Sequence, residues 1–212
     1  MIIPFSTFVP DVAIEVPGCP QPLLEHHAMH TVAQFCKETR RLRETLPAIN
    51  VVAGQGAYAI APSSSNLKVV RVENVWLDGQ PLAPVSESEL DAEMPDWRTQ
   101  VDVPSVFVWY DEELRLVPAP STAATDALVV RISYTLDVAT SQTGFDEMLY
   151  QDYSNGLAAG IKSRLMAIPG RSWSNPEMAS YYQNIFKAAI AQGRFDASGG
   201  LVRSRLRTRM HT

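Results

Sequence analysis

The chain has 212 residues, of which 46% are apolar and 19% charged, enough for one sizeable core or for two lobes that share it. No apolar run approaches the ~18 residues that a membrane-spanning helix needs, and the start, Met1-Ile2-Ile3-Pro4, lacks the basic and apolar regions of a signal peptide. We therefore expect a soluble protein that is made in a cytoplasm.

The formal net charge of −5 is unevenly distributed along the chain. The last segment, 201–212, carries Arg203, Arg205, Arg207 and Arg209 and no acidic residue. Without these four arginines, the 18 basic residues fall to 14, against 23 acidic residues. A nucleic-acid reader needs a basic surface where it meets phosphate, so an acidic body argues against that class of protein.

The first 47 residues predict an arm followed by a helix. Residues 1–20 contain four prolines and are expected to form an extended N-terminal arm. Pro22 suits the first turn of a helix, where its missing N–H is not needed. From Leu24 to Leu46 apolar residues recur in steps of three and four, which indicates one buried helical face, and Pro47 ends the predicted helix.

The middle third, residues 48–142, has the features of a small, mostly antiparallel β-domain. Residues 49–60 are expected to form a hairpin around Gly54-Gln55-Gly56. The run Leu67–Leu77 predicts a long strand, and Asp78-Gly79 a tight turn after it. Ser86 and Glu89 have the spacing of a capping box at the start of a short helix. Further strands are predicted at 105–110, 114–117 and 127–136.

Helical periodicity returns at residues 145–168, and a second helix starts near Pro176 and is expected to end at Gly193. The short connection makes these two helices antiparallel neighbours, on which the first helix should pack. The predicted class is therefore α+β, a bundle of three main helices with an inserted β-domain. The expected domains are an arm at 1–20, a bundle at 21–47 and 143–195, a β-domain at 48–142 and a basic tail at 196–212.

The tail alternates apolar or small residues with arginines, beyond a flexible joint at Gly199-Gly200. In an extended strand this alternation places the four arginines on one edge. Such a strand could join a partner's sheet or groove, with guanidinium forks on carboxylates or phosphates. The alternative is a solvated tail. The candidate binding residues are Leu201, Val202, Arg203, Arg205, Leu206, Arg207, Arg209 and Met210.

The sequence offers little that indicates catalysis, a metal or a cofactor. His26 and His30 are four residues apart on one predicted helix, but nothing nearby completes a metal site, so a helix surface or a subunit contact is the better interpretation. Cys36 falls on the apolar helical face and is expected to be buried packing. No nucleophile elbow and no complete phosphate-binding loop is present. We therefore expect that the protein is not an enzyme and that it binds no cofactor and no metal.

An ordered series of short phrases resembles the podovirus head-to-tail adaptor family, which includes proteins like tail tubular protein A. The resemblance covers about residues 10–195, and two departures, at Leu42-Arg43 and Val103-Pro104, bear on the subfamily rather than on the class. The phrases that carry it are 15–23, 35–36, 39–40, 75–79, 82–86, 96–98, 114–120, 156–165, 169–176 and Tyr181-Tyr182.

The resemblance implies a structural subunit of a virus particle, located at the head–tail junction. Members form a ring, commonly of twelve copies, beneath the portal protein, with tail components below and DNA passing through the lumen. An extended terminal arm docks onto the portal, and residues 201–210 are the candidate for that arm. Another tail or head-completion subunit is the alternative within virion proteins.

Overall fold

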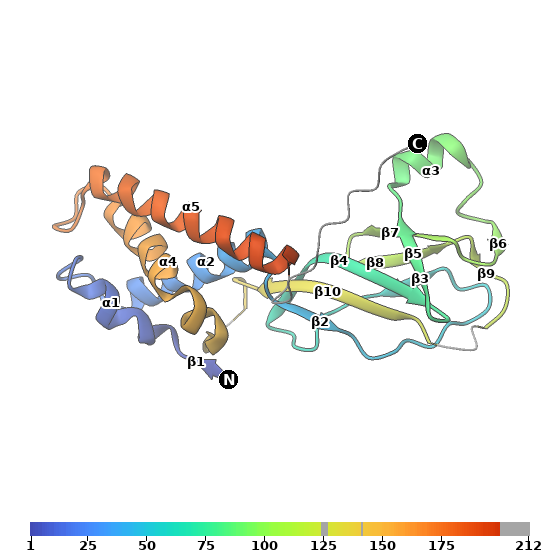
Figure 1. The fold of residues 1–212 in the computed structure, drawn as a ribbon, viewed down its shortest axis with the longest axis horizontal. Coiled ribbons are helices and arrows are strands. Elements are labelled where there is room, and N and C mark those ends of the chain that lie inside the picture. Colours follow the sequence, from blue (N-terminus) through green and yellow to red (C-terminus); the bar gives the residue numbers. More distant parts are fainter. Residues whose placement is uncertain (124–126, 141, 200–212) are drawn as a thin grey trace. The chain divides into compact units, whose positions relative to one another are not determined.

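The computed structural model describes residues 1–123, 127–140 and 142–199, and it has the α+β class predicted from the sequence (Figure 1). The chain divides into two compact units. Unit 1 is Met1–Arg41 together with the chain from Leu136 onward, and unit 2 is Leu42–Thr135. Among the described residues there are five α-helices, four of them in unit 1.

Unit 1 begins with a folded segment rather than the extended arm predicted for residues 1–20. Phe5 and Phe8 both stack on Phe145, with ring centroids 5.4 and 5.2 Å apart, which fixes this segment on the helices of unit 1. Aromatic burial thus outweighs the four prolines in setting the conformation. Its elements are β1 (Ile2–Ile3), η1 (Phe5–Phe8) and α1 (Val9–Ala13), and β1 pairs with β11 (Phe145–Asp146).

Helix α2 (Gln21–Thr39) ends earlier than Pro47, where the sequence predicted its end. Arg40 adopts a left-handed conformation with φ 52°, and its N–H donates to the Cys36 carbonyl at 2.9 Å. This closes the helix directly after its last buried residue, Thr39. Leu46, which matched the helical periodicity, belongs instead to the core of unit 2.

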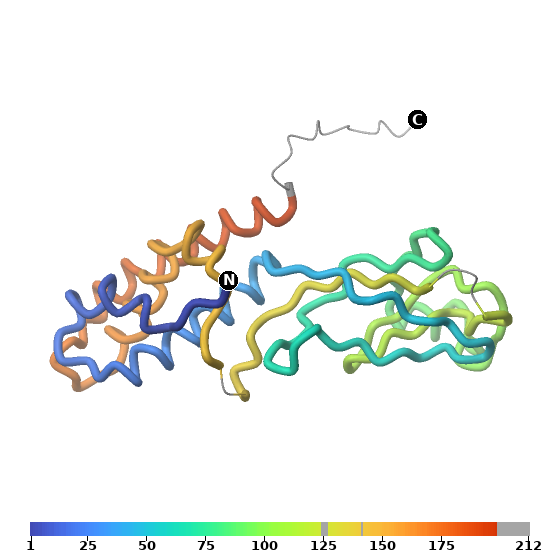
Figure 2. Tube along the Cα trace, turned by 90° about the horizontal axis from the view of Figure 1, so that it is seen from below, coloured from blue at the N-terminus to red at the C-terminus, as the bar shows by residue number. Residues whose placement is uncertain are grey.

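Helices α4 (Glu147–Met166) and α5 (Pro176–Gly199) run side by side and pack on α2 (Figures 1 and 2). Each has a side-chain cap: Asp146 accepts from the Met148 N–H at 2.9 Å, and Asn175 from the Met178 N–H at 3.1 Å. These caps satisfy N–H groups that the first turn leaves open. Inside α4, Tyr153 departs from helical angles, with φ −134°.

Glycines let the helices of unit 1 approach closely. A Cβ atom at Gly160 would lie 2.7 Å from Thr31 of α2 and 2.8 Å from Phe186 of α5, so only glycine fits where the three helices meet. Gly193 was predicted to end the last helix, but α5 continues through it to Gly199. Its role is close contact with α2, and a helix tolerates an interior glycine there because packing compensates for its low helix propensity.

Unit 2 contains a curled seven-stranded sheet in the order β2-β10-β4-β5-β7-β8-β3. The pairs with a described register are antiparallel except β5–β7, which is parallel; β6 and β9 form a separate parallel pair. The elements are β2 (Arg43–Thr45), β3 (Ala57–Ala59), β4 (Leu67–Leu77), β5 (Gln80–Pro84), α3 (Glu87–Glu93), β6 (Val101–Asp102), β7 (Val106–Tyr110), β8 (Glu113–Val117), β9 (Ala119–Pro120) and β10 (Val129–Leu136).

The hairpin predicted at residues 49–60 is wrong. Ala57–Ala59 pair with β8 rather than with residues 49–52, and Ile49 forms an isolated bridge to Leu128. The Gly54 N–H donates to the Pro120 carbonyl at 2.7 Å, so the turn is held by a distant part of unit 2. Partners remote in sequence therefore override the local turn signal.

Two tight turns connect strands of the sheet. Asp78 and Gly79, at φ 49° and 74°, join β4 to β5 as the Asp-Gly pair predicted. Asp111 and Glu112, at φ 48° and 63°, join β7 to β8 with the same pair of left-handed residues but without a glycine. Left-handed angles at both central positions match the twist of the flanking strands, which favours this turn type in hairpins.

Candidate interaction surfaces

The binding residues predicted in the C-terminal tail lie outside the described residues. This applies to Leu201, Val202, Arg203, Arg205, Leu206, Arg207, Arg209 and Met210. The candidate surfaces below therefore belong to residues 1–123, 127–140 and 142–199, and each of them lies within one unit.

Within those described ranges, no group of three or more His, Cys, Asp or Glu residues is arranged to hold a metal ion. No helix that the structure describes is long and apolar enough to cross a membrane. The Cys36 side chain is fully buried, as predicted, and burial raises the pKa of its thiol far above the ordinary value.

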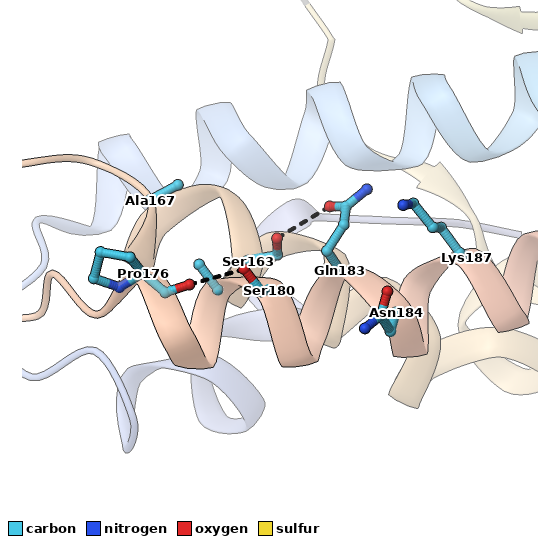
Figure 3. A pocket seen from close by; sticks show the side chains of 8 residues that line it. Ser163, Ala167, Pro176, Ser180, Gln183, Asn184 and Lys187 are labelled. Atoms are coloured by element: carbon cyan, nitrogen blue, oxygen red, sulfur yellow. Dashed lines mark hydrogen bonds between the residues drawn. The ribbon is translucent and has the colours of Figure 1, made fainter.

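A groove of about 550 Å³ lies along α4 and α5 (Figure 3). Its lining is amide, hydroxyl and small apolar groups with a single charge, that of Lys187. Ser163 Oγ donates to Gln183 Oε1 at 3.0 Å, which ties the two helices together inside the groove. Amides and hydroxyls suit recognition of a polypeptide backbone, because they both donate and accept hydrogen bonds.

A chain of polar contacts crosses unit 1 through α2. Arg164 Nη2 of α4 donates to Gln34 Oε1 at 2.7 Å, and Gln34 Nε2 donates to Glu38 Oε1 at 2.7 Å. The other Glu38 oxygen accepts from Arg194 Nη2 of α5 at 2.9 Å. This series of hydrogen bonds fixes the orientation of the Gln34 amide and joins the helices α2, α4 and α5.

Three histidines of α2 gather beside Arg164. The imidazole of His26 lies 4.5 Å from that of His30 and 5.6 Å from that of His27, centroid to centroid. Burial, together with the charges of His26 and Arg164, lowers the pKa values of His27 and His30. The sequence singled out His26 and His30, whose rings are in contact, and Arg164 lies close enough to act on His27 and His30.

A group of hydrogen bonds around Glu15, the Glu15 node, fixes the N-terminal segment to the helices. Glu15 accepts from Lys162 Nζ of α4 at 2.7 Å and from the Tyr182 hydroxyl of α5. Burial alone would raise the pKa of Glu15, but these two hydrogen bonds and the Lys162 charge together hold it below its ordinary value. The hydrogen bond that the Tyr182 hydroxyl donates to Glu15, together with burial, raises the pKa of Tyr182 to about 12.

In unit 2 a small apolar cluster lies beneath α3. Trp97, 2% exposed, is its largest member, and its Nε1 donates to Asp91 Oδ1 at 2.8 Å. The Arg98 guanidinium pairs with the same carboxylate and lies 4.2 Å from the Trp97 ring centroid. The acidic helix α3 is thus anchored by one tryptophan.

Sequence reasoning missed the partners of Arg164, Gln34 and Glu15. Each pairs with a residue more than a hundred positions away, apart from the Gln34–Glu38 bond within α2. Periodicity places Arg164 on a helix but says nothing of which neighbour it faces. A charged residue on the inner side of an amphipathic stripe is the one signal that could have drawn attention to it.

The described surfaces therefore comprise a polar groove along α4 and α5, an interhelical chain of polar contacts and a helix anchored by a tryptophan. A comparison with family profiles adds the family. The profile of the SU10 adaptor protein family matches residues 29–209, and the chain belongs to this family. A comparison with curated proteins gave no match.

The phage adaptor family expected from the sequence phrases is therefore confirmed. Its members are structural adaptors of bacteriophages, so the chain is a virion component that associates with other virion proteins.

Proposed function

We propose that this chain is the head-to-tail connector of a short-tailed phage, a homo-oligomeric ring between the portal protein and the tail. The observation that carries the proposal is the family match over residues 29–209, which covers most of the chain. The ring contains twelve copies, as the resemblance to podovirus adaptors implies. DNA passes through its lumen during ejection, and tail tube, nozzle or fibre proteins attach below.

The C-terminal residues 201–210 are the proposed portal-binding arm. The alternation of Arg203, Arg205, Arg207 and Arg209 with apolar or small residues supports this role. An added strand contributes main-chain hydrogen bonds to a partner's sheet, and the guanidinium forks add charged contacts to carboxylates on one edge.

The acidic balance of the chain supports a channel through which DNA slides. Without the four tail arginines, the 18 basic residues fall to 14 against 23 acidic residues, so the body repels phosphates rather than binding them. A lumen that lacks basic clusters leaves DNA free to move past the ring. A lumen lined mainly with lysine and arginine would contradict this part of the proposal.

The arm is tested by deleting residues 200–212, which leaves α5 intact. Attachment of the truncated protein to purified portal rings is measured by co-sedimentation, with Arg171→Gln as the control for loss of an exposed arginine elsewhere. We expect the truncation to abolish attachment and the control to retain it. Stable attachment of the truncated protein would reject the arm.

The ring itself is tested by imaging the particle. Density for this chain around the axis directly below the portal, in twelve copies, is the expected result. A position elsewhere in the particle would instead favour another tail or head-completion subunit.

A further inference from the structure

Arg164 is a partly buried arginine whose charge has no carboxylate partner among the described residues. Its one hydrogen-bond partner is the neutral amide of Gln34, at 2.7 Å. By contrast, Arg41, Arg98, Arg115 and Arg194 each pair with an aspartate or glutamate. Burial lowers the pKa of Arg164, as expected for a cation that is partly withdrawn from water.

The nearest carboxylate along this chain of contacts is already used. Glu38 accepts from Gln34 Nε2 through one oxygen and from Arg194 Nη2 through the other, at 2.7 and 2.9 Å. Arg194 also donates through Nε to the Glu38 backbone carbonyl at 3.0 Å, which holds the pair in place. Arg164 therefore keeps guanidinium N–H groups that nothing in the described structure accepts from.

His27 adds a second unsatisfied group at the same place. Its Nδ1 atom is buried and has no hydrogen-bond partner within residues 1–123, 127–140 and 142–199. Buried polar atoms almost always have a partner, so an unpaired one calls for an explanation. His26 and Arg164 act on both His27 and His30, and His30 also acts on His27; among the residues that the structure describes, α5 and η1 add no further charged group.

We propose that His27, His30 and Arg164 form a binding site for a carboxylate carried by an acidic segment of a protein partner. The Arg164 fork supplies parallel N–H donors, and a protonated imidazole supplies a further N–H. An anion compensates the charge of Arg164, whereas a metal cation would be repelled by it. The site deepens the proposed function and rests on it only for the statement that the partner is a virion protein.

A protein carboxylate fits this site better than DNA phosphate. Arg164 is partly buried between helices, where the end of a slender side chain reaches it more readily than the convex backbone of a duplex. The chain is acidic overall, at −5, and repels the dense phosphate charge of a duplex more strongly than the charge of a short acidic segment.

Binding at this site is linked to protons. A carboxylate beside His27 and His30 favours their charged forms, so binding raises their pKa values, and by reciprocity binding tightens as the pH falls through those values. A rise of one unit in the pKa of one histidine on binding corresponds to a tenfold difference in affinity between its two protonation states.

The test follows the histidine side chains of the full-length protein by NMR through a pH titration. Sodium acetate and poly-L-glutamate are the carboxylate probes, each compared with sodium chloride at equal ionic strength; single-histidine variants assign the signals. We expect both probes to raise the titration midpoints of His27 and His30 by roughly one pH unit at saturation. Arg164→Gln should lose this rise, and Arg171→Gln, at an exposed position, should retain it.

Two outcomes would overturn the site. If neither carboxylate probe changes the titration midpoints of His27 and His30, the proposed site does not exist. If duplex DNA raises the midpoints and acetate does not, the site binds phosphate rather than carboxylate. Should Arg164→Gln prove unfolded by circular dichroism, Arg164→Lys keeps the charge and loses the fork, and is expected to weaken the rise. None of these measurements involves the portal, so failure of the site is distinct from failure of the connector.

Discussion

Gly193 of α5 and Thr39 of α2 are in direct contact: a Cβ atom at position 193 would lie 2.7 Å from Thr39 Cγ2 and 2.9 Å from the Phe35 ring. Thr39 cannot easily withdraw, because its hydroxyl donates to the Phe35 carbonyl at 2.7 Å and its side chain is buried. The absence of a side chain at position 193 therefore sets how closely the two helices approach.

Gly193→Ala is expected to destabilise the protein by about 1–3 kcal/mol through overpacking. The sign is informative, since alanine at an unhindered interior helix position stabilises by up to about 1 kcal/mol relative to glycine. Urea unfolding followed by circular dichroism measures the change. The exposed α5 variant Asn184→Ala is the control and should stay within about 0.5 kcal/mol of the parent. A stabilised Gly193→Ala protein would show that the helices lie further apart.

Glu15→Gln tests the node that fixes the N-terminal segment. The pKa of Glu15 is lowered in the folded protein, so its contribution is fully present above the unfolded value, near 4.5, and is lost as the pH falls through the folded value. The carboxylate is about a third exposed, so we expect a loss of only about 0.2–1 kcal/mol at neutral pH. The difference from the parent should vanish on acidification.

The measurement is the free energy of unfolding at a series of pH values for the parent, Glu15→Gln and Glu25→Gln. Glu25 accepts a hydrogen bond only from the neutral Gln21 amide, so its variant serves as the control for loss of one acidic charge on unit 1. A Glu15→Gln deficit that persists unchanged at acidic pH would contradict an ionised Glu15 as the acceptor.

Glu112→Gly is expected to stabilise unit 2. Glu112 has φ 63°, a left-handed angle that is unfavourable for residues with a Cβ by roughly 1–2 kcal/mol and free of strain for glycine. The greater flexibility of glycine in the unfolded chain offsets part of this gain. We expect a net gain of about 0.5–1 kcal/mol, measured by urea unfolding. Glu113→Gly, one residue further within β8, is the control and should destabilise.

The two cysteines should differ sharply toward a thiol reagent. Cys36 is fully buried and the pKa of its thiol is strongly raised by burial, whereas Cys19 is partly exposed. The thiolate is the reactive form, so the native protein should react with one equivalent of Ellman's reagent, at Cys19. Two equivalents should react in denaturant. Reaction of both thiols in the native protein would mean that α2 opens readily.

The parts of the fold that the sequence predicted are those governed by local chemistry. Ser86 Oγ accepts from the Glu89 N–H at 3.3 Å, as the capping-box spacing indicated, and Asp78-Gly79 forms the expected turn. The strand Leu67–Leu77 and the helix α4 lie where periodicity placed them, and α5 begins at the predicted Pro176 but extends past Gly193 to Gly199.

The errors arose where distant contacts decide the local conformation. Periodicity carried the first helix on to Leu46, although the left-handed Arg40 ends it and Leu46 joins the sheet core. Stacking on Phe145 makes the N-terminal segment helical despite its prolines. Of the candidate carboxylate site, the sequence showed only the histidine spacing. Arg164 joins the site from α4 and lies 130 residues after its partner Gln34.

The chain leaves unit 1 after Arg41 and returns to it at Leu136, and the first and last strands of unit 2, β2 and β10, are hydrogen-bonded neighbours. Unit 2 is therefore synthesised as one uninterrupted stretch of chain, whereas unit 1 is complete only after α4 and α5 have been synthesised. On the ribosome, with synthesis proceeding from the N-terminus, the sheet can be complete while α2 still lacks the helices that cover it. Translation order thus makes the helical unit the last to mature, and it delays the groove and the Arg164 site until the whole subunit is ready to assemble.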